Sequence, residues 1–480
     1  MKILFVSSEV VPYIKTGGLA DVSGALPKAL KNRGHDVRMI LPKYNKIDSQ
    51  KFNIEPCAID YMIPNFEYKA EIEKTVEPSL EMIVYFVKCD PYYTREEIYD
   101  DYEDNAERFI FFGKAVLELM KYIDWMPDLI HCNDWQTGMI PALLRNAYNQ
   151  DSLYQDIRTL FTIHNMAYQG VFPQEKFKFT GLPESLFNLH ALEYWGQICF
   201  LKAGLVYSDI INTVSETYAK EIQTSEFGWG LEGILLERKS DLYGILNGID
   251  YEVWDPRIDS YIWYNYNENS LDQKFLNKQE LQAECQLPQT DVPIIGVISR
   301  LVDQKGFDLI EEIIDDLMQL QLQLILIGTG TPKYHQLFTQ IRENYPQQSA
   351  IYFKFDDQLA HKIEAGADFF LMPSQYEPCG LNQLISLRYG TIPIVRRIGG
   401  LADSIIDIDS SPEQSGVGFV FDNYNSQELL QKIKRALIFY NDTNRRLTII
   451  KRGMRKDFSW AVSAQKYERL YQKALQKNQI

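Results

Sequence analysis

Short apolar runs alternate with amphipathic segments along the chain. Residues 3–6 (ILFV) have no polar alternation, which is typical of a strand buried on both faces of a parallel sheet. In residues 19–33 the apolar positions recur at helical spacing, and Gly34 stands where a C-terminal cap would lie. Residues 36–42 then read as a second strand. This βαβ pattern predicts a right-handed crossover and a parallel sheet.

The same alternation of apolar runs and amphipathic segments recurs in both halves of the chain. Further strands are predicted at residues 82–87, 128–132, 159–164 and 209–214, and then at 292–299, 322–328, 351–355, 369–373 and 391–395. Residues 247–289 are polar and aromatic with no regular period, so we place the domain junction there. Apolar residues at helical spacing in 459–476 predict a closing amphipathic helix. The sequence therefore predicts an α/β fold of two Rossmann-like, doubly wound domains facing across a ligand-binding cleft.

Composition narrows the class of partner. The chain has 480 residues, with 49 Lys and Arg against 65 Asp and Glu, and a formal net charge of −16. This field repels nucleic acid and anionic membranes. The six cysteines lie at least 32 residues apart, so no zinc or redox spacing exists. Because no apolar run approaches the 18 or so residues of a membrane helix, we expect a cytoplasmic protein with no segment removed.

The loop after the first strand is the first candidate site. It carries Lys15, Gly17 and Gly18 just before a predicted helix. Glycine lets a backbone N–H approach a ligand closely, a helix N-terminus favours anions, and lysine suits phosphate. The Walker A spacing is absent. An ordinary glycine turn beside a solvated lysine remains an equal alternative.

Two cationic residues lie near the start of the second predicted domain. Arg300 ends a predicted strand and Lys305 precedes the next helix, so both could converge on a diphosphate without a metal. The alternative is two cations on a solvated loop. Glu377 also follows a buried strand, and Pro378 and Gly380 force a tight turn beside it. A carboxylate held there could bind sugar hydroxyls or stabilise an oxocarbenium-like centre.

Several other motifs admit plainer interpretations. Cys379 has no local His or Asn partner and is interpreted as a packing residue. His164 tops a predicted strand and could face a ligand, whereas His131 is more typical of a structural histidine. The Gly-Thr-Gly at 328–330 lacks the third glycine of a dinucleotide fingerprint. The Asp-Ile-Asp at 407–409 is interpreted as a turn.

Seven motifs in order resemble a known family. They are KTGGLADV at 15–22, HCNDWQT at 131–137, FTIHN at 161–165, EFGWGLEG at 226–233, NGID at 247–250, SR at 299–300 with KG at 305–306, and EPCGL at 377–381, and the segment 388–403 continues the match. Together they resemble the bacterial glycogen synthases and plant starch synthases that use ADP-glucose. The resemblance covers nearly the whole chain.

The resemblance implies a retaining glucosyltransferase of the GT-B fold, with an α-1,4-glucan acceptor and neither cofactor nor metal. It implies a domain 1–246 on the acceptor side, completed by helix 458–480, and a nucleotide-sugar domain 247–457. The implied catalytic residues are Glu377, His164, Lys305 and Arg300. The implied substrate-binding residues are Lys15, Gly17, Gly18, Asp21, Asp134, Asn165, Asn247, Gln304, Cys379, Gly380 and Leu381.

The chain departs from the family pattern at two places. Asn133 stands where many relatives carry His, and residues 95–99 lack a glycine often found in that donor-side loop, where Tyr92 and Tyr93 are further candidate contacts. Alternatives to a synthase are a phosphorylase or sugar-nucleotide epimerase of similar build, and a catalytically silent glucan-binding protein. The sequence does not separate ADP-glucose from UDP-glucose on physical grounds.

Overall fold

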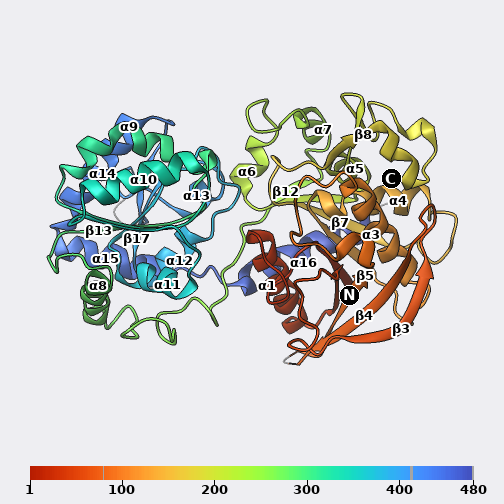
Figure 1. Ribbon diagram of the computed structural model, residues 1–480, viewed down its shortest axis with the longest axis horizontal. Helices are drawn as coiled ribbons and strands as arrows, with labels where there is room; N and C mark the ends of the chain where they lie inside the picture. Colours follow the sequence, from red (N-terminus) through yellow and green to blue (C-terminus); the bar gives the residue numbers. More distant parts are fainter. Residues whose placement is uncertain (79, 411–414, 478–480) are drawn as a thin grey trace. The chain divides into compact units, whose positions relative to one another are not determined.

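Two sheets organise the chain, one in each of two units (Figure 1). The computed structural model describes residues 1–78, 80–410 and 415–477. Unit 1 consists of Met1–Ile245 and Trp460–Ile480, and unit 2 of Leu246–Ser459. Among the described residues, no helix is long and apolar enough to cross a membrane.

Unit 1 is built on a sheet whose described strands follow the order β12-β11-β7-β6-β1-β2-β5-β4-β3. Their bounds are β1 Lys2–Val6, β2 Asp36–Pro42, β3 Glu55–Met62, β4 Lys69–Glu77, β5 Met82–Lys88, β6 Leu129–Asn133, β7 Arg158–Ile163, β11 Ile210–Thr213 and β12 Leu242–Gly244. The pairs from β12 to β5 are parallel, so the predicted parallel core and its strands are confirmed.

The expectation of a wholly parallel sheet is wrong at one edge. Strands β3 and β4 extend the sheet through antiparallel pairs to β5. Buried and solvent-facing side chains intermix along both strands, as expected where one face of an antiparallel sheet meets water. Neither strand therefore has the continuous apolar run by which the buried strands were predicted.

Helices cover unit 1 and include the predicted first helix. They are α1 Gly18–Asn32, α2 Asp90–Tyr93, α3 Asn105–Leu119, α4 Met139–Asn146, α5 Phe200–Tyr207, α6 Glu216–Glu221, α7 Glu232–Glu237 and α16 Trp460–Gln476. The cap at the end of α1 is confirmed: Gly34 has φ +88°, and its N–H and that of His35 donate to Lys31 and Leu30 carbonyls. A small sheet of β8 Val171–Pro173, β10 Gln197–Cys199 and β9 Glu193–Tyr194 completes this unit.

The closing helix α16 packs against α1 and the sheet of unit 1. The Tyr467 hydroxyl accepts a hydrogen bond from the Asn212 amide at 3.0 Å, and the Tyr471 hydroxyl lies 2.9 Å from His131 Nδ1. The other His131 nitrogen lies 2.7 Å from Thr162 Oγ1, so the structural interpretation of this histidine is confirmed. Val462 is one of the apolar residues in the stretch 459–476 that predicted this helix, but it is exposed.

Unit 2 contains a sheet whose described strands all run parallel, in the order β15-β14-β13-β16-β17-β18. Their bounds are β13 Ile294–Ile298, β14 Gln323–Ile327, β15 Ser349–Tyr352, β16 Phe369–Met372, β17 Ile392–Arg396 and β18 Phe419–Phe421. The helices are α8 Asp272–Glu284, α9 Phe307–Met318, α10 Pro332–Asn344, α11 Asp357–Gly366, α12 Asn382–Tyr389, α13 Gly399–Ser404, α14 Ser426–Tyr440 and α15 Thr443–Met454.

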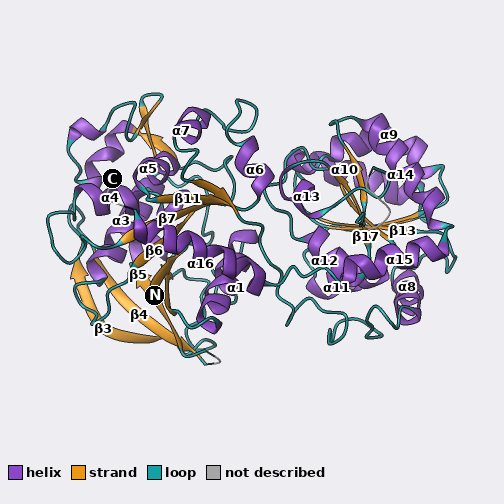
Figure 2. Ribbon diagram, turned by 180° about the vertical axis from the view of Figure 1, so that it is seen from behind, coloured by secondary structure: helices purple, strands orange, loops and turns teal. Residues whose placement is uncertain are grey.

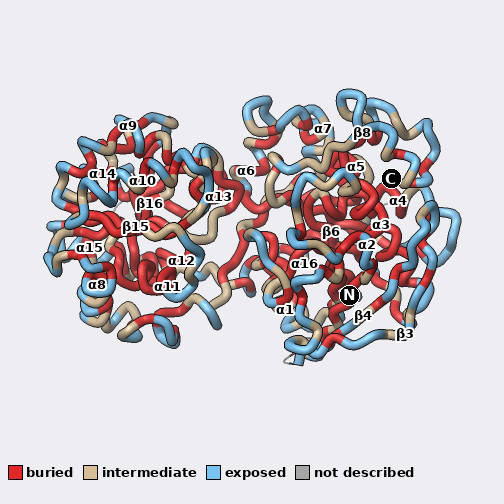
Figure 3. The backbone as a smooth tube through the Cα atoms, viewed as in Figure 1, coloured by how far each residue is buried: buried red, intermediate tan, exposed pale blue. Residues whose placement is uncertain are grey.

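The helices of unit 2 lie on both sides of its sheet. Figures 1 and 2 show α9, α10 and α14 on one side and α8, α11, α12 and α15 on the other. Buried segments fill the centre of each unit and exposed ones its edges (Figure 3). The doubly wound α/β prediction is therefore confirmed for unit 2, and for unit 1 apart from its antiparallel edge.

The junction segment is more regular than its sequence suggests. Helix α8 lies inside the stretch where no period was found. Its buried residues include Lys274, Asn277 and Lys278, so its inner face is largely polar and gives no apolar signal. Lys274 Nζ donates to the carbonyls of Glu364 and Ala365 and lies 2.9 Å from Thr391 Oγ1, so its donors are satisfied.

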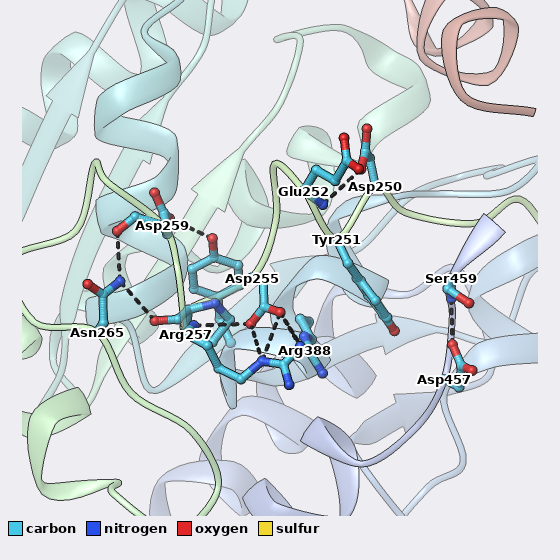
Figure 4. Close-up of polar contacts among 12 residues, drawn as sticks. Asp250, Tyr251, Glu252, Asp255, Arg257, Asp259, Asn265, Arg388, Asp457 and Ser459 are labelled. Atoms are coloured by element: carbon cyan, nitrogen blue, oxygen red, sulfur yellow. Dashed lines mark hydrogen bonds and ion pairs between the residues drawn. The ribbon is translucent and has the colours of Figure 1, made fainter. Parts of the chain in front are cut away.

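Polar contacts fix the rest of this segment onto unit 2 (Figure 4). The buried Asp255 carboxylate accepts hydrogen bonds from Arg257 and from Arg388, at 2.6 Å in the latter case. The Tyr251 hydroxyl accepts the N–H of Phe458 at 2.9 Å, so the start of unit 2 is bonded to its end.

Candidate functional site

The glycine loop of unit 1 lies open to solvent. Lys15 Nζ and the Asp21 carboxylate form an ion pair at 2.7 Å, with 55% and 35% of the two side chains exposed. A Cβ added at Gly17 or Gly18 would meet no atom within 4 Å. The structure thus brings Lys15, Gly17, Gly18 and Asp21 together at the start of α1 and leaves room beside the backbone.

A carboxylate that the sequence analysis missed holds this loop. Glu9 is 4% exposed and its carboxylate accepts the N–H of Thr16 at 2.6 Å, the N–H of Gly17 at 3.2 Å and the Thr16 hydroxyl at 2.9 Å. Burial raises the pKa of Glu9, and these hydrogen bonds oppose the increase. The Gly17 N–H is therefore already bonded to Glu9, which counts against its use as a donor to a ligand.

The loop at residues 95–99 reaches the same carboxylate. The Tyr99 hydroxyl lies 2.5 Å from Ser8 Oγ and 3.4 Å from Glu9 Oε1. Tyr99 therefore joins the loop that lacks the family's glycine to the base of the Lys15 loop. Tyr92 and Tyr93 are both buried, and the Tyr93 hydroxyl donates to the Arg108 carbonyl, so their expected role as ligand contacts is not supported.

Asp134 lies at the carboxyl end of β6 in a strained backbone conformation. It has φ +56° and ψ −179°, a region that non-glycine residues rarely adopt. Its carboxylate accepts the backbone N–H of His164 at 2.7 Å and the N–H of Asn165. Burial raises the pKa of Asp134 to about 7, and the negative charge of Glu9 adds to the increase. The structure thus brings Asp134, His164 and Asn165 together at the ends of the adjacent strands β6 and β7.

Asn133, one of the two departures from the family pattern, contacts His164. Asn133 Oδ1 lies 3.0 Å from His164 Nε2, while Asn133 Nδ2 donates to the Val6 carbonyl. An amide oxygen only accepts, so Nε2 carries the ring proton. Burial lowers the pKa of His164 to about 3, so the ring is neutral at pH 7. His164 can then form hydrogen bonds to a sugar but carries no charge.

The centre of the unit 2 group is a buried ion pair. Lys305 Nζ lies 2.6 Å from Glu377 Oε2, with 18% and 7% of the side chains exposed, and Ser374 Oγ donates to the same oxygen at 2.9 Å. Lys305 ends the turn after β13 and Glu377 follows β16, and these strands are parallel neighbours. The carboxyl ends of parallel neighbours meet at one edge of the sheet, so the two side chains lie close together.

Backbone contacts fix this pair in place. The Gln304 side chain donates to the Tyr376 carbonyl at 3.2 Å, and the Gln375 N–H donates to the Gln304 carbonyl at 2.9 Å. Gly306 has φ +72°, and a Cβ there would lie 2.0 Å from the Pro373 carbonyl oxygen. Only glycine therefore allows the two loops to approach so closely.

The turn after Glu377 carries the remaining unit 2 candidates. Burial raises the pKa of the Cys379 thiol to about 12, and Asn247 hydrogen-bonds to its sulfur. A protonated, buried thiol supports the packing interpretation. The Asn247 Oδ1 atom is buried without a partner in the part of the chain that the structure describes. Gly380, at φ +68°, and Leu381 then lead into α12.

Arg300 is not joined to the ion pair. It lies at the end of β13 and is exposed. Its guanidinium makes no ion pair within residues 1–78, 80–410 and 415–477. Lys305 is therefore paired with Glu377 and Arg300 is not, and the convergence of the two cations on a diphosphate stays a prediction.

The Gly-Thr-Gly at 328–330 and the Asp-Ile-Asp at 407–409 both have structural explanations. A Cβ at Gly328 or Gly330 would lie 1.9 Å from the Ser299 oxygen or 2.1 Å from the Leu301 oxygen, so these glycines allow neighbouring chain segments to pack. Asp409 pairs with Arg435 at 2.8 Å, and Asp407 lies 3.4 Å from Lys432. The interpretation of 407–409 as a turn is supported, whereas Gly330 forms a β-bridge with Leu301.

Comparisons with known proteins agree with these motifs. A family model described as "Starch synthase catalytic domain" matches residues 2–237, and one described as "Glycosyl transferases group 1" matches 278–455. A protein named "Glycogen synthase" from Fervidobacterium nodosum is 46% identical, with all of both chains covered, and one from Desulforamulus reducens is 46% identical over 99% of each.

Solved structures give the same result. The catalytic domain of starch synthase IV from Arabidopsis thaliana, bound to ADP and acarbose, is similar with a TM-score of 0.92, 33% identity and 99% of each chain covered. A sucrose-phosphate synthase from Thermosynechococcus elongatus, with a TM-score of 0.61 and 19% identity over 98% of each chain, shares the fold. The chain therefore belongs to the glycogen and starch synthase family of glycosyltransferases, which have the GT-B fold.

Proposed function

We propose that this enzyme transfers glucose from ADP-glucose to the non-reducing end of an α-1,4-glucan, with retention of configuration and release of ADP. The names of its relatives and the ADP and acarbose bound to the starch synthase structure support this donor and this acceptor. The observation that carries the proposal is the Lys305–Glu377 pair, because it places a cation and a carboxylate together at one sheet edge.

Unit 2 is proposed to bind the nucleotide sugar. The charges of Lys305 and Arg300 would neutralise the diphosphate as the bond from C1 to the phosphate oxygen breaks and ADP leaves with the electron pair. The Asn247 Oδ1 atom, which has no partner among the described residues, and the turn from Cys379 to Leu381 would supply further polar atoms near Glu377, and Gln304 would act with Lys305.

Unit 1 is proposed to bind the reacting sugars. Lys15 and Gly18 would approach the donor, while the Asp21 and Asp134 carboxylates and the Asn165 amide would contact hydroxyl groups. Neutral His164, held by Asn133, would position the glucose by hydrogen bonding.

Glu377 is proposed to stabilise the transition state rather than to attack C1. Its carboxylate is paired with Lys305 and accepts the Ser374 hydroxyl, and both interactions reduce its nucleophilicity. The glucosyl group would then pass directly from ADP to the acceptor oxygen on the same face. Isolation of a glucosyl–Glu377 adduct from a slow substrate would overturn this assignment.

The test is incorporation of glucose into glycogen from ADP-glucose and, separately, UDP-glucose, without added metal. We expect transfer from ADP-glucose with the native protein, a loss of at least 1,000-fold in Glu377→Ala, and near-native rates in Asp409→Asn. Asp409 is the matched control because it is a carboxylate of the same unit that also pairs with cations.

The rival functions give different results. Glycogen binding without turnover of either donor would indicate a silent glucan-binding protein, and interconversion of nucleotide sugars without glucan would indicate an epimerase. A phosphorylase would require phosphate and show the absorbance of a pyridoxal cofactor. The cytoplasmic location expected from the sequence stays a prediction.

A further inference from the structure

Three large aromatic side chains of unit 1 are exposed outside the group described above. Trp195 is 81% exposed, Tyr168 53% and Trp229 47%. Trp195 lies at the tip of the β9–β10 hairpin, and Trp229 lies in the EFGWGLEG motif, which runs into the start of α7. That motif has no role in the proposed catalytic group. Exposed aromatic clusters of this kind mark surfaces that bind ligands or partners.

Hydrogen bonds join the three segments at one carbonyl. The Tyr194 hydroxyl donates to the Trp229 oxygen at 2.7 Å, and the Gln169 side chain donates to the same oxygen at 3.0 Å. Residues 168–169, 194–195 and 229 therefore belong to one local cluster. Gly230 has φ +81°, and a Cβ there would lie 2.5 Å from the Tyr194 hydroxyl, so glycine permits this contact.

Both tryptophans have an unfavourable backbone conformation. Trp195 and Trp229 each have φ +52°, in the left-handed region where glycine and asparagine are the usual residues. The high exposure of Trp195 means that packing within the unit does not explain why a bulky ring is held there. Strain of this kind concentrates at ligand-binding sites.

The support of the cluster is rigid. The Gly196 N–H donates to Glu193 Oε1 at 2.6 Å across the hairpin tip, and β10 pairs with both β8 and β9. Lys202 Nζ donates to the carbonyls of Leu189 and Glu193, which fixes the base of the hairpin. The backbone that carries Trp195 is therefore already ordered, so less conformational entropy is lost when its ring binds a ligand.

The cluster is continuous with the candidate site. The Tyr168 N–H donates to the Asn165 carbonyl at 3.2 Å, so the loop that carries His164 and Asn165 leads directly to Tyr168. Farther along this loop, the Gly170 carbonyl accepts the N–H of Phe200, which follows the hairpin. A polymer held at Asn165 could therefore extend over the aromatic cluster.

We propose that Tyr168, Trp195 and Trp229 form a glucan platform, a second contact surface for an α-glucan chain whose end reacts at the candidate site. This inference rests on the proposed function. The C–H faces of glucose rings stack on indole and phenol rings, while the side chains of Gln169 and Gln197 can bond to hydroxyl groups at the ring edges. A glucan is uncharged, so neither Glu193 and Glu226 nor the net charge of −16 repels it.

The experiment measures glycogen and maltoheptaose binding by affinity electrophoresis and by tryptophan fluorescence, without donor. Trp195→Asn and the double variant Trp195→Asn/Trp229→Asn remove the rings, and asparagine tolerates the positive φ. Leu189→Asn is the matched control, because Leu189 is 71% exposed beside the same hairpin and has no ring. Melting temperatures establish that each variant is folded.

We expect the double variant to bind glycogen at least tenfold more weakly and to show a higher KM for glycogen, with Leu189→Asn close to native.

Equal glycogen affinity in the double variant and the native protein would overturn the platform. Conversion of an oligomer to a monomer by Trp195→Asn, with glycogen affinity unchanged, would assign the surface to a second copy and also overturn it. Native turnover of ADP-glucose with no effect of the variants rejects the platform alone, while glycogen binding that depends on the rings without turnover rejects the proposed synthase alone.

Discussion

The two units each carry a lysine–carboxylate pair, and the pairs differ mainly in burial. Lys15 and Asp21 in unit 1 lie 2.7 Å apart with 55% and 35% of their side chains exposed. Lys305 and Glu377 in unit 2 lie 2.6 Å apart with 18% and 7% exposed. Water screens the first pair, whereas the second pair keeps most of its interaction energy and much of its desolvation cost.

The buried charges of unit 1 are stabilised differently. Glu9 and Asp134 are carboxylates that accept backbone N–H groups, and neither is paired with a cation among the described residues. Burial therefore raises the pKa of both groups. Unit 2 instead holds its central carboxylate against a fixed cation, so we expect this carboxylate to be the more sensitive to removal of its partner.

The largest effect is expected for Lys305→Gln. Removal of the lysine leaves Glu377 buried beside Ser374 alone and removes the positive charge proposed to face the diphosphate. We expect kcat to fall about 1,000-fold and the free energy of unfolding to fall by about 3 kcal/mol. Steady-state kinetics with ADP-glucose and urea unfolding measure the two quantities.

A double variant separates charge pairing from the loss of either group. In Lys305→Met/Glu377→Gln the buried carboxylate charge is also absent, so much of the lost stability should return while activity stays low. A double variant as unstable as Lys305→Gln would show that the unpaired carboxylate charge is not what destabilises Lys305→Gln. The contrast in stability with the exposed pair of Lys15 and Asp21 would then disappear.

Burial explains which parts of the fold were predictable from the sequence. Strands β1, β13 and β14 have apolar runs because both faces of the sheet are covered, and each was predicted within two residues. Strands β3 and β4 have one wet face, and α8 buries lysine and asparagine against carbonyls and side-chain oxygens. A pattern of hydrophobic residues indicates only where apolar side chains are buried. Elements that bury polar side chains, and edge strands with one exposed face, were therefore not predicted.

The candidate site was predictable where its residues follow buried strands. His164 and Glu377 were found by this rule, since polar side chains at the carboxyl ends of parallel strands face ligands. Glu9 follows β1 in the same way and was missed because it precedes the more conspicuous glycine loop. The ion pair of Lys305 with Glu377 and the contact of Asn133 with His164 are tertiary contacts that a single sequence does not record.

The second largest effect is expected for Glu9 of unit 1, whose buried carboxylate is stabilised by N–H groups and not by a cation. Glu9→Gln removes the negative charge that accepts the Thr16 and Gly17 N–H groups, and it puts an NH₂ group where the carboxylate accepted either these donors or the Thr16 and Tyr99 hydroxyls. We expect a loss of about 1 to 3 kcal/mol in stability and a drop of about 100-fold in kcat as the Lys15 loop loses its position. Glu97→Gln is the control, because Glu97 is exposed and pairs with Lys46. Native kcat in Glu9→Gln would argue against a positioning role for Glu9.

The third effect is a pH dependence that arises in unit 1. The pKa of Asp134 is about 7 in the folded protein against an ordinary value of 3.8. Between pH 4 and pH 7 the folded state holds the Asp134 proton that the unfolded state has lost, so this group lowers stability as pH rises. Asp134→Asn should therefore gain stability relative to the native protein between pH 5 and pH 8, by about 2 kcal/mol. Urea unfolding at pH 5 and at pH 8 measures the difference in stability between Asp134→Asn and the native protein. The same difference at both pH values would contradict the prediction.

The smallest effect is expected for the exposed pair, and it decides whether burial is the real difference between the units. A double-mutant cycle of Lys15→Gln and Asp21→Asn should give a coupling energy below about 1 kcal/mol in unfolding, and 0.5 M salt should weaken it further. The same cycle on Lys305 and Glu377 should give a coupling energy several times larger that salt changes little, because their charges are shielded from ions. Lys15→Gln should nevertheless raise the KM for ADP-glucose, since an exposed lysine remains available to a phosphate. Equal coupling in the two cycles would show that the 2.6 to 2.7 Å contacts, rather than the burial around them, set the strength of these pairs.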